Sequence, residues 1–374
     1  MKILIYQPRI SYYVGGGEML AMDHACFLAK MGHEVEVVTI KSDFIKITDT
    51  FYNFVQSNKN LKIHYIEIPL CLKDIYKKTP GHDWKRWDIE SLELIKLAKH
   101  IIDSSKADIF TCYNFVDVLA LPREKKTVVL LLGYPTNINY LHEVLSQIDT
   151  NHIAVSSYVK QKWSVLLSSH NISVSRNGLD SDKFRDNKAK KTNDIFYVGR
   201  MISIKGIQYL IKSIVELKKE YLNIKVLLAG DGPHRKRLEK LSEKLNLKSN
   251  ITFLRRITEE EKIHYYNISR ISVFPSYDRE GILITMLESS CCGTPVLTTT
   301  ACSMKEFIKN GINGFMVQPK SSKAISDKIK YLFKNPELLE KTGNQSRKDV
   351  VSHWDWSKKI KDLEKNYEEI ISNN

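Results

Sequence analysis

The sequence predicts an α/β protein made of two doubly wound parallel-sheet modules of similar size. Short aliphatic and β-branched runs alternate with amphipathic helical patterns along almost the whole chain, and this alternation is typical of parallel sheets covered by helices. A length of 374 residues is enough for two domains. A polar, lysine-rich segment at 186–194 separates two series of elements and has the composition of a linker.

The first series opens with a βαβ unit. Residues 3–6 have the composition of a buried strand, a glycine cluster follows, and apolar spacing predicts a helix from about 19 to 31. A second strand is expected at 35–40. Further expected elements are strands at 63–68, 109–112, 128–132 and 152–155, and a helix at about 91–104.

The second series follows the polar segment. Strands are expected at 195–198, 224–229, 251–254, 271–274 and 295–298, and helices at 206–219, 233–245, 259–267 and 284–292. We therefore expect an N-terminal domain of residues 1–185 and a C-terminal domain of residues 186–353. An amphipathic helix at 354–374 is expected to pack back on the first domain.

Composition and charge narrow the range of partners. The chain is 43% hydrophobic and 27% charged, as is common for globular proteins. Residues 1–180 hold 21 basic and 19 acidic residues, whereas the remainder holds 36 and 24, so most of the net charge of +14 lies in the second half. This excess favours an anionic ligand there, although a solvated lysine-rich surface accounts for most of it. No nucleic-acid-binding motif accompanies the charge, so nucleic acid is not an expected partner.

Cysteines and apolar runs bear on the location of the protein. The six cysteines form no Cys-x-x-Cys pair, which predicts reduced thiols in a cytoplasmic protein and no metal site. The longest apolar runs, such as 127–133, are too short to cross a bilayer, and the first residues lack the features of a signal peptide. Segment 73–87 mixes cations with aromatics, which favours peripheral membrane contact or, equally, a loop that covers an acceptor.

A glycine cluster lies between the first strand and the first helix. It reads Gly15-Gly16-Gly17-Glu18. Backbone amides at a helix start attract phosphate, and glycines allow close approach. The spacing is not Gly-x-Gly-x-x-Gly, so this is no dinucleotide fingerprint. A tight turn without a ligand is the alternative.

Two cations follow the first strand of the second series. Arg200 and Lys205 lie five residues apart on one strand-to-helix loop. A guanidinium and an ammonium can hold a diphosphate from two directions and neutralise the charge that develops on a diphosphate leaving group. The alternative is a pair of ordinary exposed cations.

Two carboxylates bracket another strand-to-helix junction. Glu280 precedes a helix that is expected to begin within 282–285, and Glu288 lies in its second turn. Eight residues separate the carboxylates by about 12 Å at most. This span suits one acid on a sugar and one on a ribose, with a diphosphate at the helix amides between them. The alternative is an acid stabilised by the helix dipole plus a solvated helical Glu.

In order along the chain, these and other motifs resemble those of one family, the retaining glycosyltransferases of family 4 (glycosyl transferases group 1). The motifs are Gly-Gly-Glu near the start, Asn177-Gly-Leu-Asp180, Gly199-Arg200…Lys205-Gly206, Ala229-Gly-Asp-Gly-Pro233, Pro275-Ser276, Glu280-Gly281…Glu288, Cys292-Gly-Thr-Pro-Val296 and Asn310-Gly-Ile-Asn-Gly-Phe315. The likeness spans nearly the whole chain. It implies the GT-B fold, in which two Rossmann-like domains face each other across a cleft.

The resemblance also implies an activity and a site. It implies metal-independent transfer of a sugar from a nucleoside diphosphate sugar, most readily of UDP or GDP, to a glycan, lipid-linked or small-molecule acceptor, with retention of configuration. The implied catalytic residues are Glu280, Arg200 and Lys205. The implied donor-binding residues are Gly16, Gly17, Arg200, Lys205, Ile257, Glu280, Ile282, Leu283, Ile284 and Glu288. No metal ligand and no cofactor other than the donor are implied.

Three positions depart from the family pattern. Glu280-Gly-Ile-Leu283 stands where Glu-Gly-Phe-Gly is frequent. The strand ends at 111–114 and 131–134 lack the histidine that the family often carries near the donor sugar, and the nearby His142 is expected at the surface. Arg255 replaces a frequent glycine in a loop expected near the base.

These departures leave two other readings open. The first is a catalytically silent relative that binds a nucleotide sugar or supports a partner transferase. The second is an epimerase or phosphorylase on similar paired modules, although no separate phosphate or cofactor site is visible for it. The presence of all four donor-contact charges, Arg200, Lys205, Glu280 and Glu288, favours the transferase.

Overall fold

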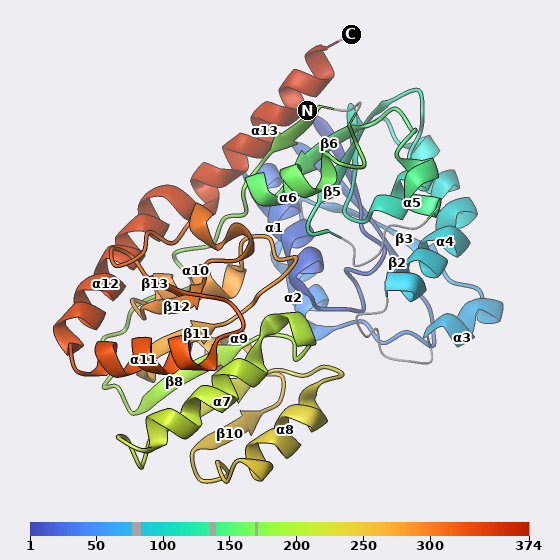
Figure 1. Ribbon diagram of the computed structural model, residues 1–374. Coiled ribbons are helices and arrows are strands. Elements are labelled where there is room, and N and C mark those ends of the chain that lie inside the picture. The colour runs from blue at the N-terminus through green and yellow to red at the C-terminus, as the bar shows by residue number, and fades with distance from the viewer. Residues whose placement is uncertain (77–83, 135–139, 169–170, 374) are drawn as a thin grey trace. The chain divides into compact units, whose positions relative to one another are not determined.

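The computed structural model describes residues 1–76, 84–134, 140–168 and 171–373 (Figure 1). Its contacts divide the chain into two compact units, Met1–Asn177 with Ser357–Asn374, and Gly178–Trp356. The sequence had suggested a boundary after residue 185. Residues 178–185 join the second unit because the Leu179 N–H donates to the Trp354 carbonyl at 2.8 Å and Phe184 lies in the second core.

The described residues of the first unit form a seven-stranded parallel sheet of order β3-β2-β1-β4-β5-β6-β7. The strands are β1 Lys2–Tyr6, β2 Glu34–Lys41, β3 Lys62–Glu67, β4 Ile109–Cys112, β5 Lys126–Leu131, β6 Asn151–Ala154 and β7 Ile172–Val174. In β1 every residue after Lys2 is buried, as is usual when helices cover both faces of a parallel sheet. The strand order reverses direction at β1, between β2 and β4.

The helices of the first unit differ from the expected ones mainly at their starts. The first helix begins at Gly16 rather than 19, because the glycine cluster forms its first turn, and the helix expected at 91–104 begins at Trp84. Short helices at 49–57, 140–145 and 157–163 carry too few turns to show a clear apolar period. The helices are α1 Gly16–Lys30, α2 Asp49–Ser57, α3 Lys73–Tyr76, α4 Trp84–Ser104, α5 Tyr140–Leu145 and α6 Ser157–Trp163, with 3₁₀ turns at Leu70–Leu72 and Phe115–Ala120.

From Ser357 on, the C-terminal helix α13, Trp356–Ser372, belongs to the first unit; Figure 1 shows the helix at the red end of the chain. Leu363 and Tyr367 are fully buried. The Tyr367 hydroxyl lies 2.9 Å from the Thr111 hydroxyl at the end of β4. The apolar stripe of this helix is therefore part of the first core, although more than 200 residues separate it from β4.

The second unit, residues 178–356, all of which the structure describes, contains a six-stranded parallel sheet of order β10-β9-β8-β11-β12-β13. The strands are β8 Asn193–Val198, β9 Val226–Ala229, β10 Ile251–Leu254, β11 Ser269–Phe274, β12 Val296–Thr299 and β13 Phe315–Val317. The order reverses between β8 and β11, and ligands of open α/β sheets bind beyond the strand ends at such a point.

The helices of this unit include two that the sequence analysis did not predict, α11 and α12. The segment 186–194, which was expected to be a linker, is instead part of the second unit. Asn193 begins β8, and Lys191 donates to the Asn267 carbonyl at 2.8 Å. The helices are α7 Ile207–Lys218, α8 Arg235–Lys244, α9 Glu259–Ile268, α10 Ile284–Cys291, α11 Ser322–Phe333 and α12 Pro336–Asp349, with 3₁₀ turns at Ser203–Lys205 and Cys302–Glu306 and a π turn at Val350–Trp354.

The structure bears on the expectations about membrane contact and about the cysteines. Across the four described ranges, no helix combines the length and apolar character needed to cross a membrane. The centre of the cationic and aromatic segment 73–87, residues 77–83, lies outside the described residues. All six cysteines are free thiols. Cys112, Cys291 and Cys292 are buried, whereas Cys26 and Cys302 are partly exposed and Cys71 is exposed.

Candidate functional site

A glycine brings the loop after β8 against the loop after β11. Gly206 has φ +70° and ψ +13°, a left-handed conformation that glycine adopts without strain. A Cβ at this position would lie 2.0 Å from the Pro275 carbonyl oxygen. The Tyr277 N–H also donates to the Ile204 carbonyl at 2.9 Å. The two loops at the reversal point of the sheet are therefore joined by backbone contacts.

The loop from β11 to α10 places Glu280 with the help of a strained neighbour. Arg279 has φ +55°, which is uncommon for a residue other than glycine. Such conformations persist where surrounding contacts hold them, often at functional sites. The Ser303 hydroxyl donates to the Glu280 carbonyl at 3.2 Å, which fixes the loop from the other side.

Lys205 and Glu280 form an ion pair in this place. The Lys205 Nζ lies 2.8 Å from Glu280 Oε1, and the two side chains are only 11% and 12% exposed. Glu280 Oε1 is buried, and among the described residues its contact is the ion pair with Lys205 rather than a well-aligned hydrogen bond. Such a carboxylate oxygen can accept a further hydrogen bond from a hydroxyl of a ligand.

Arg200 lies in the same loop and is half-buried. Its positive charge acts on the pKa of the neighbouring Tyr197. The Tyr197 hydroxyl donates to the Arg200 carbonyl at 3.2 Å. Burial raises the pKa of Tyr197 well above its ordinary value, the Glu280 carboxylate raises it further, and the Arg200 guanidinium opposes both. The charges of Arg200 and Glu280 thus act on one phenol, which stays protonated at neutral pH.

Glu288 is buried between two helices of the second unit. Its Oε1 accepts from Lys262 Nζ at 2.7 Å and its Oε2 accepts from the Tyr266 hydroxyl at 2.8 Å. The side chain is 7% exposed. The alternative of a solvated helical Glu is therefore wrong at this position. Its predicted contact with a ribose stays a prediction.

The start of α10 offers backbone groups rather than side chains. The helix begins at Ile284, and the capping residue Leu283 makes no side-chain cap in this fully described stretch. Ile282 and Leu283 are buried in the second core, so only their backbone could reach a ligand. The first N–H groups of a helix have no intrahelical partner and attract anions. Ile257 packs against the same core just before α9.

Gly16 and Gly17 belong to the first unit, where they form the first turn of α1. Gly15 is the N-terminal capping residue of this helix, and among the described residues no side chain hydrogen-bonds to the cap. A Cβ on Gly17 would lie 2.7 Å from the Leu132 side chain, whereas one on Gly16 would meet nothing within 4 Å. A side chain at Gly17 would therefore require the end of the Leu132 side chain to shift, whereas the space at Gly16 is open.

Three described histidines of the first unit are buried, namely His24, His142 and His152. His142, expected at the surface, is 5% exposed and its ring stacks on Phe115 with centroids 6.0 Å apart. Burial lowers its pKa. His24 lies on α1, with Nδ1 2.8 Å from the Tyr113 hydroxyl. The sequence analysis missed the burial of His142 because it depends on the packing of α5 against the 3₁₀ turn at 115–120.

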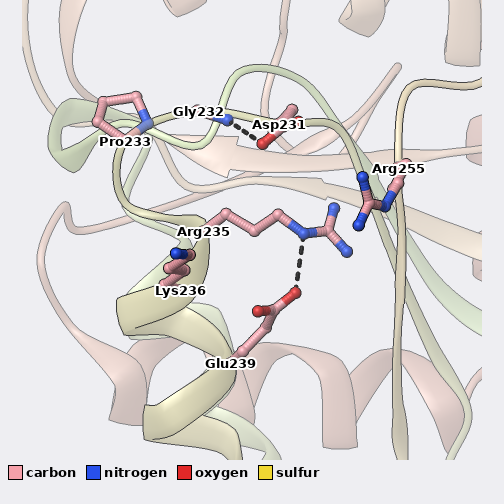
Figure 2. A pocket seen from close by; sticks show the side chains of 7 residues that line it. All are labelled: Asp231, Gly232, Pro233, Arg235, Lys236, Glu239 and Arg255. Atoms are coloured by element: carbon pink, nitrogen blue, oxygen red, sulfur yellow. Dashed lines mark hydrogen bonds and ion pairs between the residues drawn. The ribbon is translucent and has the colours of Figure 1, made fainter.

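A pocket of about 390 Å³, lined mostly by charged residues, lies at the ends of β9 and β10 (Figure 2). Arg235 donates to the Gly230 and Leu254 carbonyls at 2.7 and 2.6 Å and so joins the two strand ends. In Figure 2 its guanidinium points from α8 toward Arg255. The Met201 N–H donates to the Asp231 carbonyl at 2.8 Å, so the pocket adjoins the Arg200 loop. The lining residues are Asp231, Gly232, Pro233, Arg235, Lys236, Glu239 and Arg255.

Sequence reasoning missed the residues that hold the predicted ones in place. Lys262 and Tyr266 lie at positions i and i+4 of α9 and so share one helix face. That spacing was visible in the sequence, but the partner of the face was not. Within the described ranges, no group of three His, Cys, Asp or Glu side chains is arranged to hold a metal ion.

Comparison with known proteins identifies the second unit. Residues 180–349 match the family model described as glycosyl transferases group 1. The chain carries a glycosyl transferases group 1 domain. An uncharacterized glycosyltransferase of Methanocaldococcus jannaschii is 26% identical over 94% of this chain and 93% of its own length. This group 1 domain contains the predicted Arg200, Lys205, Glu280 and Glu288.

Two further relatives extend the comparison. The capsular polysaccharide biosynthesis glycosyltransferase CapM of Staphylococcus aureus is 31% identical to the chain over 58% of this chain and 61% of its own. The structure of Anabaena HepE in complex with UDP and glucose shares the fold with a TM-score of 0.75 at 15% identity, over 99% of this chain and 100% of that one. The two parallel-sheet units and these neighbours show the predicted GT-B fold.

Proposed function

We propose that the protein transfers a sugar from a nucleoside diphosphate sugar to an acceptor hydroxyl with retention of configuration, as the resemblance to family 4 implies. The main support is the largely buried Lys205–Glu280 pair, with side chains 11% and 12% exposed, at the reversal point of the second sheet and just before the uncapped start of α10. In such a sheet this is the position for a phosphate-containing ligand.

Each charged group has a role in this reaction. Glu280 accepts hydrogen bonds from the donor sugar hydroxyls, and Lys205 and Arg200 bind the diphosphate. The bond between the anomeric carbon and the β-phosphate oxygen breaks, and the acceptor oxygen bonds to that carbon on the same face. The acceptor proton passes to the leaving diphosphate. Because the two cations stabilise the developing charge, we propose that transfer requires no metal ion.

The substrates are proposed from the relatives. HepE has been crystallised with UDP and glucose, which supports a UDP sugar as donor. A relative from Mycolicibacterium smegmatis, 24% identical over 48% of this chain, is named as GDP-mannose-dependent, so GDP is the other candidate. The name of CapM supports a growing glycan as acceptor. We propose that the reaction occurs in the cytoplasm, with peripheral membrane contact if the acceptor is lipid-linked.

The first test is removal of the Lys205 ammonium. The protein is incubated with UDP and GDP sugars, with and without EDTA, and released nucleoside diphosphate is measured. We expect Lys205→Ala to lower kcat at least about tenfold, because about 1.4 kcal/mol or more of transition-state stabilisation is lost. Glu280→Ala is expected to be similarly impaired, and EDTA is expected to change nothing.

A matched control separates this effect from a general loss of charge. Lys212 is an exposed lysine on α7, in the same unit, and Lys212→Ala should keep wild-type rates. Near-normal turnover in Lys205→Ala would contradict the diphosphate assignment. NMR of the product decides the stereochemistry, since an inverted anomeric configuration would refute retention.

A further inference from the structure

Two residues of α9 hold the carboxylate of Glu288 from two directions. Lys262 and Tyr266 lie one helical turn apart, and each donates to a different oxygen of Glu288, at 2.7 and 2.8 Å. A carboxylate held through both oxygens cannot rotate without breaking one of these contacts. Its orientation is therefore determined by α9 rather than by α10, which carries it.

Burial makes these contacts strong. The Glu288 side chain is 7% exposed and that of Lys262 is 21% exposed. A buried carboxylate is costly unless it is paired and hydrogen-bonded, and hydrogen bonds to charged groups are stronger than neutral ones. Lys262 Nζ also lies 5.3 Å from the centroid of the Phe184 ring, which limits its freedom on one side.

Tyr266 is the more rigid of the two donors. It is fully buried, its ring packs edge-on against Phe196, and its hydroxyl also lies 3.2 Å from the Thr285 carbonyl. Burial, and then the charge of Glu288, raise the pKa of Tyr266 well above its ordinary value, so the phenol remains a donor.

We propose that Lys262 and Tyr266 are positioning residues that orient the Glu288 carboxylate toward the ribose hydroxyls of the donor nucleotide. This inference rests on the proposed function. An ionised carboxylate has about four acceptor sites, and Lys262 and Tyr266 use two of them. The remaining sites can accept from the 2′- and 3′-hydroxyls of a ribose. Lys262 and Tyr266 thereby set the preference of the enzyme for a ribonucleotide.

A purely structural contact between α9 and α10 would have a different consequence. It would stabilise the second unit and leave the recognition of ribose unchanged. The decisive measurement is therefore the ratio of dissociation constants for a 2′-deoxynucleoside diphosphate and its ribonucleotide. This ratio reports on a hydroxyl contact and is insensitive to a uniform loss of affinity.

The experiment measures this ratio by isothermal titration calorimetry with UDP and 2′-deoxy-UDP, and with GDP and 2′-deoxy-GDP. We expect wild type to bind its preferred ribonucleotide at least about tenfold more tightly than the deoxy form, as expected for a hydrogen bond to a charged group. Glu288→Gln and Lys262→Met should each reduce the ratio below about threefold. Lys262→Arg should restore most of it. In turnover, Lys262→Met should raise the donor KM and leave kcat within about twofold, since the contact is the same in ground and transition states.

The control is Lys240→Met, which replaces an exposed lysine on α8 and should leave the ratio at its wild-type value. Tyr266→Phe, which removes one donor and keeps the ring, replaces Lys262→Met if that variant does not fold. An unchanged ratio in a folded Lys262→Met or Tyr266→Phe protein would overturn the inference while the proposed function stands. An unchanged ratio in Glu288→Gln would also overturn it. Failure of wild type to bind any of the four nucleotides would refute the proposed function as well.

Discussion

His24 is a titratable group that the first unit keeps neutral. It is 3% exposed on α1, and its Nδ1 lies 2.8 Å from the Tyr113 hydroxyl. Burial lowers its pKa from 6.5 to about 3. In the unfolded chain the same imidazole titrates near its ordinary pKa. Between these two values only the unfolded state takes up the proton, so acid favours unfolding.

The first prediction follows from this difference. As pH falls from 7 to 5, His24 should lower the free energy of unfolding by about 2 kcal/mol, with the loss continuing toward the folded-state pKa. The effect is absent above about pH 7, where both states are neutral at this position. Urea unfolding at pH 7 and pH 5 measures it.

The matching variant is His24→Gln, which keeps a polar side chain and removes the titration. The variant is expected to be less stable than wild type at pH 7, and the difference should shrink by about 2 kcal/mol at pH 5. An equal difference at the two pH values would mean that His24 is not the group responsible.

A second buried charge illustrates how single residues join distant elements. Arg9 follows β1 and is 2% exposed. Its guanidinium contacts Glu90 of α4 at 3.1 Å and Asp117 at 3.3 Å, and it donates to the Ser91 hydroxyl at 2.8 Å. Removing one member of such a group leaves an uncompensated buried charge. The cluster holds the loop before the glycine turn against α4.

Among the structural elements, the loop from β8 to α7 depends on one glycine. Gly206 combines a left-handed backbone with direct packing against Pro275. Gly311 has a similar φ of +80°, but a Cβ there would meet nothing within 4 Å. The two positions therefore separate the effect of backbone strain from that of a steric clash.

We predict that Gly206→Ala costs more than Gly311→Ala. Both variants place an L-residue in the left-handed region, at about 1–2 kcal/mol. Gly206→Ala should add a further loss and displace Lys205, so that turnover falls at least about tenfold. Thermal unfolding and nucleotide-release assays on both variants measure these effects. Equal stability and equal activity of the two proteins would contradict the packing role of Gly206.

At the level of the whole chain, the two units have separate cores, and the last helix belongs to the core of the first. Tyr367 of α13 is fully buried, and its hydroxyl is hydrogen-bonded to the Thr111 hydroxyl. Leu179 and Trp354 lie near the two ends of the second unit in sequence, and they are joined by a backbone hydrogen bond. A change in α13 should therefore act on the N-terminal sheet although it lies at the opposite end of the sequence.

We predict that Tyr367→Ala destabilises the first unit by about 3–5 kcal/mol, as is usual when a large buried aromatic is removed. Tyr367→Phe should cost only about 1 kcal/mol, since it removes a hydrogen bond and keeps the ring. Hydrogen exchange followed by mass spectrometry should show faster exchange in β1 and β4 of Tyr367→Ala, with β8 and β11 less affected. Equal acceleration in both sheets would show that the units unfold together.

The elements that sequence analysis predicted are those whose signal is local. The apolar runs of β1, β8 and β10 and the periodicity of α7 and α9 are visible within windows of a few residues, and their observed ends lie within two or three residues of the expected ones. The ordered set of motifs along the chain, which includes those around Arg200, Lys205, Glu280 and Glu288, likewise predicted the fold and a group 1 glycosyltransferase domain. The helix α12 has a largely polar sequence and is followed by a π turn, so its apolar periodicity was too weak to predict a helix.

By itself, then, the sequence determined the alternation of strands and helices, the division into two parallel-sheet units and the charged residues of the candidate site. Only the tertiary structure decided what those residues contact. It paired Lys205 with Glu280, gave Glu288 its two donors on α9, buried His142 and brought α13 into the first core. The physical reason is that patterning and turn preferences act between near neighbours, whereas burial and ion pairing depend on side chains that only chain folding brings together.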